Sequence, residues 1–316
     1  MNKVEDIAAA WGADGPVCLI AERENAVYRV SINDAPVALR LHRKGYQEKA
    51  SILSELIWTN RLADAEFSCP RPVSMPDGSL LLEIDGGRYA SVISWVDGMP
   101  IGRAEEAFDG TITEHCDLYR GVGLLLAELH NVTDSIKTND ITRPSWNLSG
   151  LLGKSPFWGR FWENPSLSAS EKKFMIYARD AAYAHLEGMK DADFGLIHAD
   201  AVQENIFSTP SGLTLIDFDD SGFGYRGYDL GALMSQHYTL RYLDDLIEAV
   251  RDGYGVLRPA PSLEDIHFFL MLRGFASSGW VIPREPKKST TQRRYAERAL
   301  HLSYQWLNIN ITRFKQ

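Results

Sequence analysis

Cysteine is scarce in this chain of 316 residues, and long apolar runs are absent. Cys18, Cys69 and Cys116 are scattered, so they form neither a metal-ligand spacing nor an even set for disulfides, and we expect a reducing cytoplasm. The longest apolar runs are far shorter than a bilayer crossing requires, and residues 1–6 lack the apolar core of a secretory signal. The sequence therefore predicts a cytoplasmic protein with no membrane partner.

Basic residues are also in the minority. The chain has 33 Lys and Arg against 42 Asp and Glu, which gives a formal net charge of −9 at pH 7. An excess of negative charge disfavours a nucleic-acid partner and favours a cationic small molecule. Internal repeats and low-complexity tracts are lacking, and a chain of this length with 45% hydrophobic residues supports two lobes, each with its own core. The sequence makes no prediction of the oligomeric state.

The most informative part of the chain is a pair of short motifs near its middle. The first contains His198, Asp200 and Asn205, and the second, a dozen residues later, contains Asp217 and Asp219. Transfer of a phosphoryl group from ATP requires a carboxylate beside the attacking hydroxyl and oxygen ligands for magnesium. Asp200 is the candidate for that carboxylate, and Asn205, Asp217 and Asp219 are the candidate ligands. The motifs therefore predict ATP and Mg²⁺ as cofactors.

Simpler interpretations exist for some of these side chains. An aspartate before an apolar run is often a helix cap, and we expect this for Asp229. His198 is expected to hold its loop by hydrogen bonds. Asp200, in contrast, lies between two strand-like runs, and the next predicted hairpin returns Asp217 toward it. This context favours one common site for Asp200, Asn205 and Asp217.

The two motifs resemble H-R-D-x-x-x-x-N and D-F-G of protein kinases, with Ala199 in place of the Arg and Asp219 in place of the Gly. The chain after Asp217 leaves no room for a peptide-holding activation segment. The sequence therefore resembles the aminoglycoside phosphotransferase, choline kinase and type II homoserine kinase superfamily. This resemblance implies an α+β, bilobal, protein-kinase-like fold. Residues 1–97 would form a nucleotide-binding lobe, an antiparallel sheet with one helix, and residues 98–316 a mostly α-helical catalytic and substrate-binding lobe.

The resemblance assigns a cation to the third of three N-terminal strand-like runs. These runs cover residues 18–21, 27–32 and 37–41. The third matches the V-A-I-K strand of kinases, with Arg40 in place of Lys. Arginine keeps the charge that would meet the phosphates of ATP, but its planar fork has a different geometry. An exposed cation at a sheet edge is the alternative for Arg40.

Two further residues are assigned to the nucleotide by the same resemblance. Glu55, on a predicted helix over residues 48–63, is expected to hold the strand cation, with Glu48 as its rival and an exposed helical glutamate as the alternative. The turn before the second strand has no glycine, and only Asn25 in it tolerates left-handed backbone angles well. Asn25 is therefore assigned to the phosphates, although a turn that merely connects two strands is an equal interpretation.

A hinge is predicted at the end of a strand over residues 89–96, where Asp97 and Gly98 follow. The backbone groups of Ser94, Trp95 and Val96 would there meet the adenine ring. Trp95 is also a candidate core aromatic.

The remainder of the chain is predicted to be helical, apart from an irregular segment rich in tryptophan over residues 141–165. His130 is expected at the carbonyl end of its helix, without a catalytic role. The predicted helices cover residues 114–130, 171–190, 230–238, 242–254, 263–277 and 293–308.

The predicted reaction converts ATP and the hydroxyl group of a small molecule into a phosphate ester and ADP. The resemblance, with several arginines near the expected pocket, favours a hydroxy amino acid or an amino alcohol, homoserine-like. The arginines that are candidates for holding a substrate carboxylate are Arg273, Arg284, Arg293 and Arg294.

Three alternatives stay open on the sequence alone. An aminoglycoside O-phosphotransferase would place a dense acidic cluster in the C-terminal helices, whereas here Glu264 and Asp265 are diluted by arginines. A compact protein Ser/Thr kinase is disfavoured by the missing activation segment. A nucleotide-binding pseudokinase would normally have lost one of Asp200, Asn205 or Asp217, and all three are present.

Overall fold

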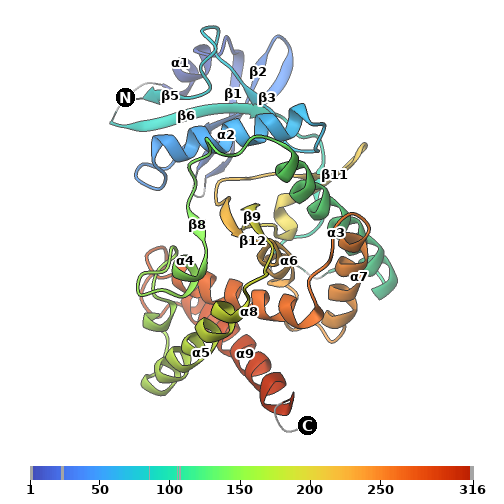
Figure 1. Cartoon of the computed structure of the whole chain (residues 1–316). Helices are drawn as coiled ribbons and strands as arrows, with labels where there is room; N and C mark the ends of the chain where they lie inside the picture. Colours follow the sequence, from blue (N-terminus) through green and yellow to red (C-terminus); the bar gives the residue numbers. More distant parts are fainter. Residues whose placement is uncertain (1–2, 23–24, 85, 105, 107, 314–316) are drawn as a thin grey trace. The chain divides into compact units, whose positions relative to one another are not determined.

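The structure, a computed structural model, describes residues 3–22, 25–84, 86–104, 106 and 108–313, with side chains to residue 308 (Figure 1). The chain forms two compact units, and neither is continuous in sequence. The first comprises Met1–Ile101, Val132–Arg143 and Phe207–Asp219, and the second comprises Gly102–Asn131, Pro144–Ile206 and Asp220–Gln316. The division into lobes at residue 97 stays a prediction.

The first unit is built on an antiparallel sheet. The strand order is β1-β2-β3-β6-β4, and β5 pairs with the remaining part of β6. The strands are β1 (Asp14–Glu22), β2 (Ala26–Ile32), β3 (Ala35–Leu41), β4 (Pro72–Val73), β5 (Leu82–Ile84) and β6 (Arg88–Ser94). They confirm the three predicted N-terminal strands and the strand before the hinge.

The two faces of this sheet have different roles, because side chains alternate along a strand. Leu39 and Leu41 of β3 belong to an apolar core that a short helix, α1 (Val4–Ala9), closes with Ile7. The sequence pattern did not predict α1. Arg40, between the two leucines, lies on the opposite face, where it contacts Glu55 of α2 (Lys49–Asp64), the predicted helix.

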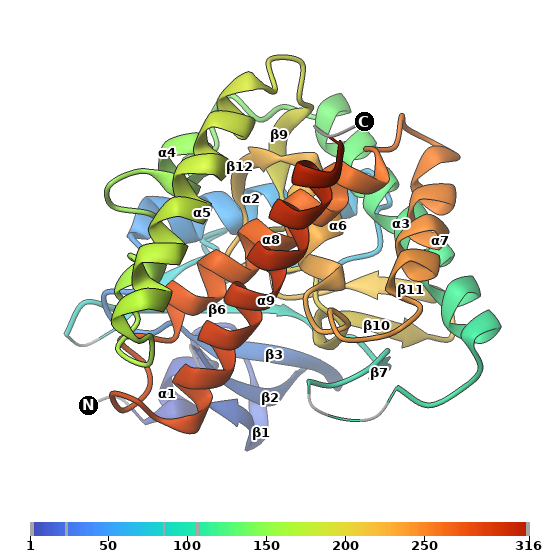
Figure 2. The ribbon, with the colours of Figure 1, turned by 90° about the horizontal axis from the view of Figure 1, so that it is seen from below.

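The second unit is mostly helical, as predicted. Its helices are α3 (Ile112–Ser135), which ends in the first unit, α4 (Leu148–Leu152), α5 (Ala169–Gly188), α6 (Arg226–Met234), α7 (Leu243–Gly255), α8 (Leu263–Trp280) and α9 (Thr290–Arg313). In Figure 2, α8 and α9 lie side by side, with α5 against α9. None of the described helices is both long and apolar enough to span a membrane.

Two small sheets frame the central motifs. One has the order β8-β12-β9, from β8 (Ser145–Trp146), β12 (Gly222–Tyr225) and β9 (Phe194–Ile197). The other has the order β11-β10-β7, from β7 (Met99–Pro100), β10 (Ile206–Thr209) and β11 (Gly212–Leu215). Asp200 follows β9, and Asp217 follows β11, so each motif begins where a strand ends.

Two helix ends differ from the prediction. Helix α6 begins at Arg226, four residues earlier than expected, and its N-cap is Tyr225. Asp229 is therefore inside the helix and does not cap it. Helix α3 continues to Ser135, so His130 lies within that helix and not at its carbonyl end. Both side chains are fully buried, and their hydrogen bonds are described below.

Helices α6 and α8 pack closely because glycine forms the contact. A Cβ atom on Gly231 would lie 2.5 Å from the backbone nitrogen of Leu270, so a larger residue would push the helices apart. In the tryptophan-rich segment, Trp146 is 1% exposed and its ring stacks on Tyr228 of α6 at 5.5 Å. Trp146 of this segment therefore packs against the helical unit.

Candidate active site

The strand cation is held in a buried ion pair in the first unit. Nη1 of Arg40 lies 2.6 Å from Oε1 of Glu55, and both side chains are almost completely buried. Burial alone lowers the pKa of Arg40. The carboxylates of Glu55 and Asp219 more than offset this effect, so the pKa of Arg40 lies above its ordinary value. Glu55, and not Glu48, is therefore the partner of Arg40, and Arg40 is no exposed edge cation. Their role in binding a nucleotide stays a prediction.

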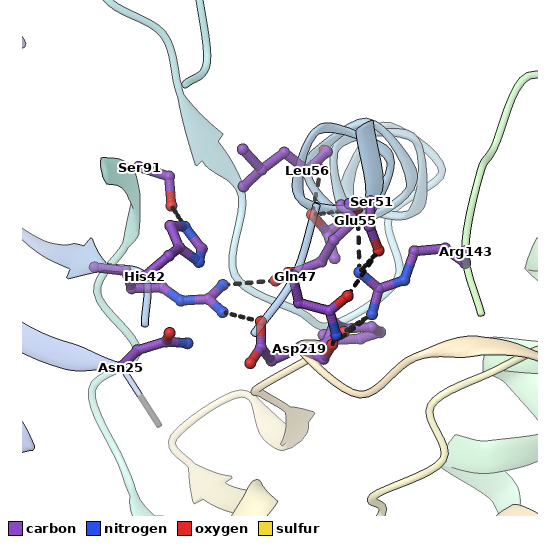
Figure 3. A network of polar contacts seen from close by, with 12 residues as sticks. Asn25, His42, Gln47, Ser51, Glu55, Leu56, Ser91, Arg143 and Asp219 are labelled. Carbon is purple, nitrogen blue, oxygen red and sulfur yellow. Dashed lines mark hydrogen bonds and ion pairs between the residues drawn. The ribbon is translucent and has the colours of Figure 1, made fainter. Parts of the chain in front are cut away.

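Asp219 is held in the same network (Figure 3). Its carboxylate lies 3.5 Å from Nη2 of Arg40, and its backbone oxygen accepts hydrogen bonds from Gln47 at 3.1 Å and Arg143 at 2.5 Å. Arg143 also binds the backbone oxygen of Ser51 on α2 at 3.1 Å. Burial, with the nearby charge of Glu55, raises the pKa of Asp219 to about 7, against the effect of Arg40.

Asp217 differs from Asp219 in every respect. Its side chain is exposed, and its backbone has a φ of 62°. A left-handed conformation is uncommon for a residue with a Cβ atom, although aspartate adopts it more readily than most, and such residues recur at functional sites. The turn therefore presents one carboxylate to solvent at Asp217 and buries the other at Asp219. The burial of Asp219 argues for an outer-shell position, and its role as a metal ligand stays a prediction.

The other predicted nucleotide residues have local partners. Oδ1 of Asn25 accepts a hydrogen bond from the backbone nitrogen of Arg43 at 3.1 Å, and residues 23–24 of its turn lie outside the described residues, so its assignment to the phosphates stays a prediction. The backbone N–H of Ser94 donates to Arg71 at 2.8 Å and is not available to an adenine ring. Trp95 lies under the guanidinium of Arg29, 5.1 Å from ring centre to Cζ.

The predicted hinge borders a cavity. Residues 94–97 line a space of about 540 Å³, with further walls from residues 63–71 and 209–214 of the same unit. The contacts of Trp95 and Val96 with an adenine ring stay a prediction.

The second unit holds the predicted catalytic loop. Nδ2 of Asn205 donates to the backbone oxygen of Asp200 at 2.9 Å and to its Oδ2 at 3.0 Å. The backbone N–H of Asp200 donates to Nδ1 of His198 at 3.2 Å, which is the loop-holding role expected for that histidine. The structure thus brings Asp200 and Asn205 together, and the role of Asn205 as a metal ligand stays a prediction.

Asp229 anchors this loop from α6. Its two carboxylate oxygens accept hydrogen bonds from the backbone nitrogens of His198 at 2.8 Å and Ala199 at 2.6 Å. Ala199 has a φ of 65°, so these bonds hold a backbone turn that alanine seldom adopts. Oδ2 of Asp229 also pairs with Nε2 of His130 at 3.1 Å. The predicted cap is therefore a loop anchor, a role that its position before an apolar run did not reveal.

Arg273 is a site residue whose contact the sequence did not predict. From α8, its Nη2 lies 2.5 Å from Oδ1 of Asp200, and its Nη1 donates to the backbone oxygen of Ala199 at 3.3 Å. The side chain is 9% exposed. Because Arg273 is 73 residues from Asp200 in sequence, no local pattern links the two. Arg273 was proposed as a ligand of a substrate carboxylate, but here it binds the candidate catalytic carboxylate.

Solved structures with this fold are kinases. The microcompartment-associated aminopropanol kinase is 27% identical in sequence and has a TM-score of 0.82. The alignment covers 96% of this chain and 97% of the chain of that kinase. Amicoumacin kinase has a TM-score of 0.76 and is 18% identical over 94% of this chain and 92% of that one, a likeness of fold alone. These neighbours confirm the predicted α+β, bilobal, protein-kinase-like fold.

The family is shown by the sequence comparisons. The model of the phosphotransferase enzyme family matches residues 17–265, and the chain belongs to this family. The homoserine kinase of Allorhizobium ampelinum is 29% identical over 260 residues, which are 80% of this chain and 74% of that protein. The homoserine kinase of Agrobacterium fabrum is 28% identical over the same shares. The predicted superfamily is thus confirmed, and the chain is an ATP-dependent kinase of a small molecule.

The buried position of Arg40 gives a first prediction. Arg40→Ala should lower the free energy of unfolding by about 3 kcal/mol or more, because it leaves the carboxylates of Glu55 and Asp219 buried without their cation. Adding Glu55→Gln should restore part of the loss. Urea unfolding without nucleotide measures both effects. Arg120→Ala, which breaks an exposed pair with Asp117, is the control and should cost less than about 1 kcal/mol. Equal losses for Arg40→Ala and Arg120→Ala would show that the buried pair has no structural weight.

The His130 contact gives a prediction of pH dependence. Burial lowers the pKa of His130 from 6.5 to about 4, against the hydrogen bond to Asp229. Between these values the unfolded chain binds a proton that the folded chain does not. The free energy of unfolding should therefore fall as the pH falls from about 6.5 to 4, by on the order of 2–3 kcal/mol from this residue.

Urea unfolding at a series of pH values tests this dependence. His130→Gln should reduce the dependence of the unfolding free energy on pH. Part of the dependence should remain, because burial also lowers the pKa values of His42 and His237. His301→Gln, at an exposed position, is the control. A slope that is the same in His130→Gln and the parent would remove the assignment.

Proposed function

We propose that this enzyme transfers the γ-phosphoryl group of ATP, with Mg²⁺, to the hydroxyl of a hydroxy amino acid or an amino alcohol, homoserine-like. The relatives support this substrate class, because homoserine kinases match 80% of the chain and an aminopropanol kinase shares its fold at 27% identity. One observation carries the mechanism: Asn205 and Arg273 both hold the carboxylate of Asp200. Other neighbours, such as the aminoglycoside phosphotransferase at 12% identity, share the fold alone.

Asp200 is proposed as the group that receives the substrate hydroxyl. Its carboxylate would orient the hydroxyl by a hydrogen bond and accept its proton as the bond to phosphorus forms. The contacts with Asn205 and Arg273 fix the rotamer of Asp200. The side chain therefore loses little conformational entropy when the transition state forms. The ion pair with Arg273 favours the ionised form, which is the form that accepts a proton.

Asn205 and Asp217 are proposed as the protein ligands of magnesium. Both supply oxygen atoms, which Mg²⁺ prefers, and the ion usually completes its shell with water and phosphate oxygens. The residues fit this role, because the amide nitrogen of Asn205 is committed to Asp200 while its oxygen is left, and Asp217 is exposed on a strained turn. When bound, magnesium would offset the charge of the phosphates. No group of three or more His, Cys, Asp or Glu suited to a metal ion is found in the part of the chain that the structure describes.

The remaining assignments concern the nucleotide. Arg40, held by Glu55, is proposed to bind phosphate oxygens through the part of its fork that now meets Asp219. Asn25 and the backbone groups of Trp95 and Val96, with the backbone oxygen of Ser94, are proposed as further contacts of the nucleotide. The cytoplasm is the proposed location, which agrees with three cysteines that are all free.

Magnesium dependence is the first test of this proposal. ATP binding measured by calorimetry should be strengthened by Mg²⁺ and weakened by a chelator, because the metal bridges phosphates and protein. Asp217→Ala should remove most of the difference. Asp191→Ala, at an exposed position outside the motifs, is the control. Affinity that ignores both chelator and Asp217→Ala would leave Asp217 without a metal role.

The second test separates the two carboxylates by phenotype. Asp200→Asn keeps size and hydrogen bonding but removes the proton acceptor, so turnover should fall by about a hundred- to ten-thousandfold while ATP binding is nearly kept. Asp217→Asn should weaken Mg²⁺ and ATP binding together with the rate. Single-turnover phosphorylation of L-homoserine and calorimetry are the two measurements. Transfer by Asp200→Asn within a few-fold of the parent would show that this loop is not catalytic.

A further inference from the structure

Helix α9 carries an arginine that lacks a carboxylate partner. The guanidinium of Arg298 lies over the rings of Tyr295 and Tyr238, with Cζ at 5.1 and 5.4 Å from their centres. Among the residues that the structure describes, no Asp or Glu forms an ion pair with Arg298, and its buried Nε has no hydrogen-bond partner. Arg293 of the same helix, in contrast, pairs with both Glu171 and Glu297. Arg298 thus differs from Arg293, five residues earlier on the same helix.

The surroundings of Arg298 are positively charged. Burial lowers the pKa of Arg298, and the nearby guanidinium groups of Arg273 and Arg294 lower it further. The two tyrosine faces stabilise the guanidinium of Arg298 in part but offer no acceptor for its N–H groups. Within this cluster of arginines, Arg298 has no carboxylate partner among the described residues, so an anion with acceptor oxygens would stabilise it.

The cluster is joined to the candidate catalytic carboxylate. Arg273 holds Asp200 at 2.5 Å through Nη2, while its Nε, also buried, has no hydrogen-bond partner. The guanidinium of Arg273 also lies over the ring of Trp158, with Cζ at 4.7 Å from the ring centre, so its side chain contacts both Trp158 and Asp200. All of these residues belong to the second unit. The backbones beside Arg273 and Arg298 approach closely, because a Cβ atom on Gly274 of α8 would lie 3.6 Å from Cα of Ala299 of α9. An acceptor whose hydroxyl meets Asp200 can therefore direct an anionic end toward Arg298.

We propose that Arg298, assisted by Arg273, binds the carboxylate of the acceptor, and that the acceptor is a hydroxy amino acid and not an amino alcohol. This inference rests on the proposed function and narrows it. A guanidinium fork matches a carboxylate by two parallel hydrogen bonds, which a neutral chain end cannot form. Arg273 binds Asp200 with one arm and completes the anion site with its charge. The two substrate classes of the relatives are distinguished by this site, because only one of them carries a carboxylate.

A matched pair of acceptors tests the proposal on the unmodified enzyme. L-homoserine and 3-amino-1-propanol have the same hydroxyl and amine and differ by the carboxylate. With saturating Mg²⁺ and ATP, kcat/KM should favour homoserine by about ten- to hundredfold or more, the effect of hydrogen bonds to a charged group. L-homoserine amide, which keeps the shape and loses the charge, should behave like the amino alcohol. Equal use of homoserine and its amide overturns the anion site.

Variants of α9 assign the preference to Arg298. In Arg298→Gln the preference for homoserine over 3-amino-1-propanol should shrink by about ten- to hundredfold, mainly through the KM of homoserine, and Arg298→Lys should recover part of it. Arg293→Gln, an arginine of the same helix with its own carboxylate partners, is the control and should keep the preference of the parent. An unchanged preference in Arg298→Gln overturns the assignment.

The outcomes separate this inference from the proposed function. If the parent phosphorylates neither compound nor any other hydroxy amino acid or amino alcohol, the proposed function fails and the anion site fails with it. If the parent uses the amino alcohol as well as homoserine, the kinase activity stands and only the anion site is wrong. Should Arg298→Gln not fold, the comparison of homoserine with its amide on the parent still decides.

Discussion

The buried carboxylate of Asp229 is the contact on which the catalytic loop depends. It is fully buried, and its charge is balanced by the N–H groups of His198 and Ala199 and by the ring of His130. Hydrogen bonds to an ionised acceptor are among the stronger ones in proteins, and here they hold Ala199 in a left-handed turn. The direction in which Asp200 points follows from that turn. A residue of α6 therefore determines the geometry of a site in which it takes no chemical part.

In the first unit, buried carboxylates are stabilised by an arginine side chain, whereas backbone N–H groups stabilise that of Asp229. Arg40 serves two carboxylates, Glu55 at 2.6 Å and Asp219 at 3.5 Å, which a compact ammonium group would do less well. The surrounding contacts are directed at backbone oxygens, since Arg143 and Gln47 both bind the carbonyl of Asp219. Side chains of the segments before α2 and before β8 thus fix the turn in which Asp217 is presented. Rigid support of this kind keeps an exposed, strained carboxylate in place.

The sequence predicted what depends on local pattern. The match to the V-A-I-K strand predicted Arg40 on β3, and helical periodicity predicted the helices to within a few residues. Motif spacing identified Asp200 and Asn205, which the structure brings together. The selection of Glu55 over Glu48 was also correct, because only Glu55 faces Arg40. Helix α1 was missed, since six residues are too few to establish a periodic pattern.

Contacts between distant segments were the main source of error. Asp229 looked like a cap because α6 begins earlier than its apolar run, and the anchoring of residues 198 and 199 spans some thirty positions. The roles proposed for Arg273 and Arg298 depend on residues that are close in space but distant in sequence. Four arginines were expected near the pocket, but their carboxylate partners depended on which segments α8 and α9 pack against: Arg273 pairs with Asp200 of the catalytic loop, and Arg293 pairs with Glu171 of α5. Charge alone does not show whether a cation is already neutralised.

Because Arg40 pairs with two carboxylates, a substitution at position 40 affects which residues are tolerated at position 219. Arg40 and Asp219 are 179 residues apart, yet each suits the other: a guanidinium reaches two acceptors, and a carboxylate at position 219 needs a second donor. A lysine at position 40 would leave Asp219 poorly matched, and a glycine at position 219 would leave part of the arginine fork without an acceptor. We therefore expect the two positions to change together among relatives, as a pair inherited across the length of the chain.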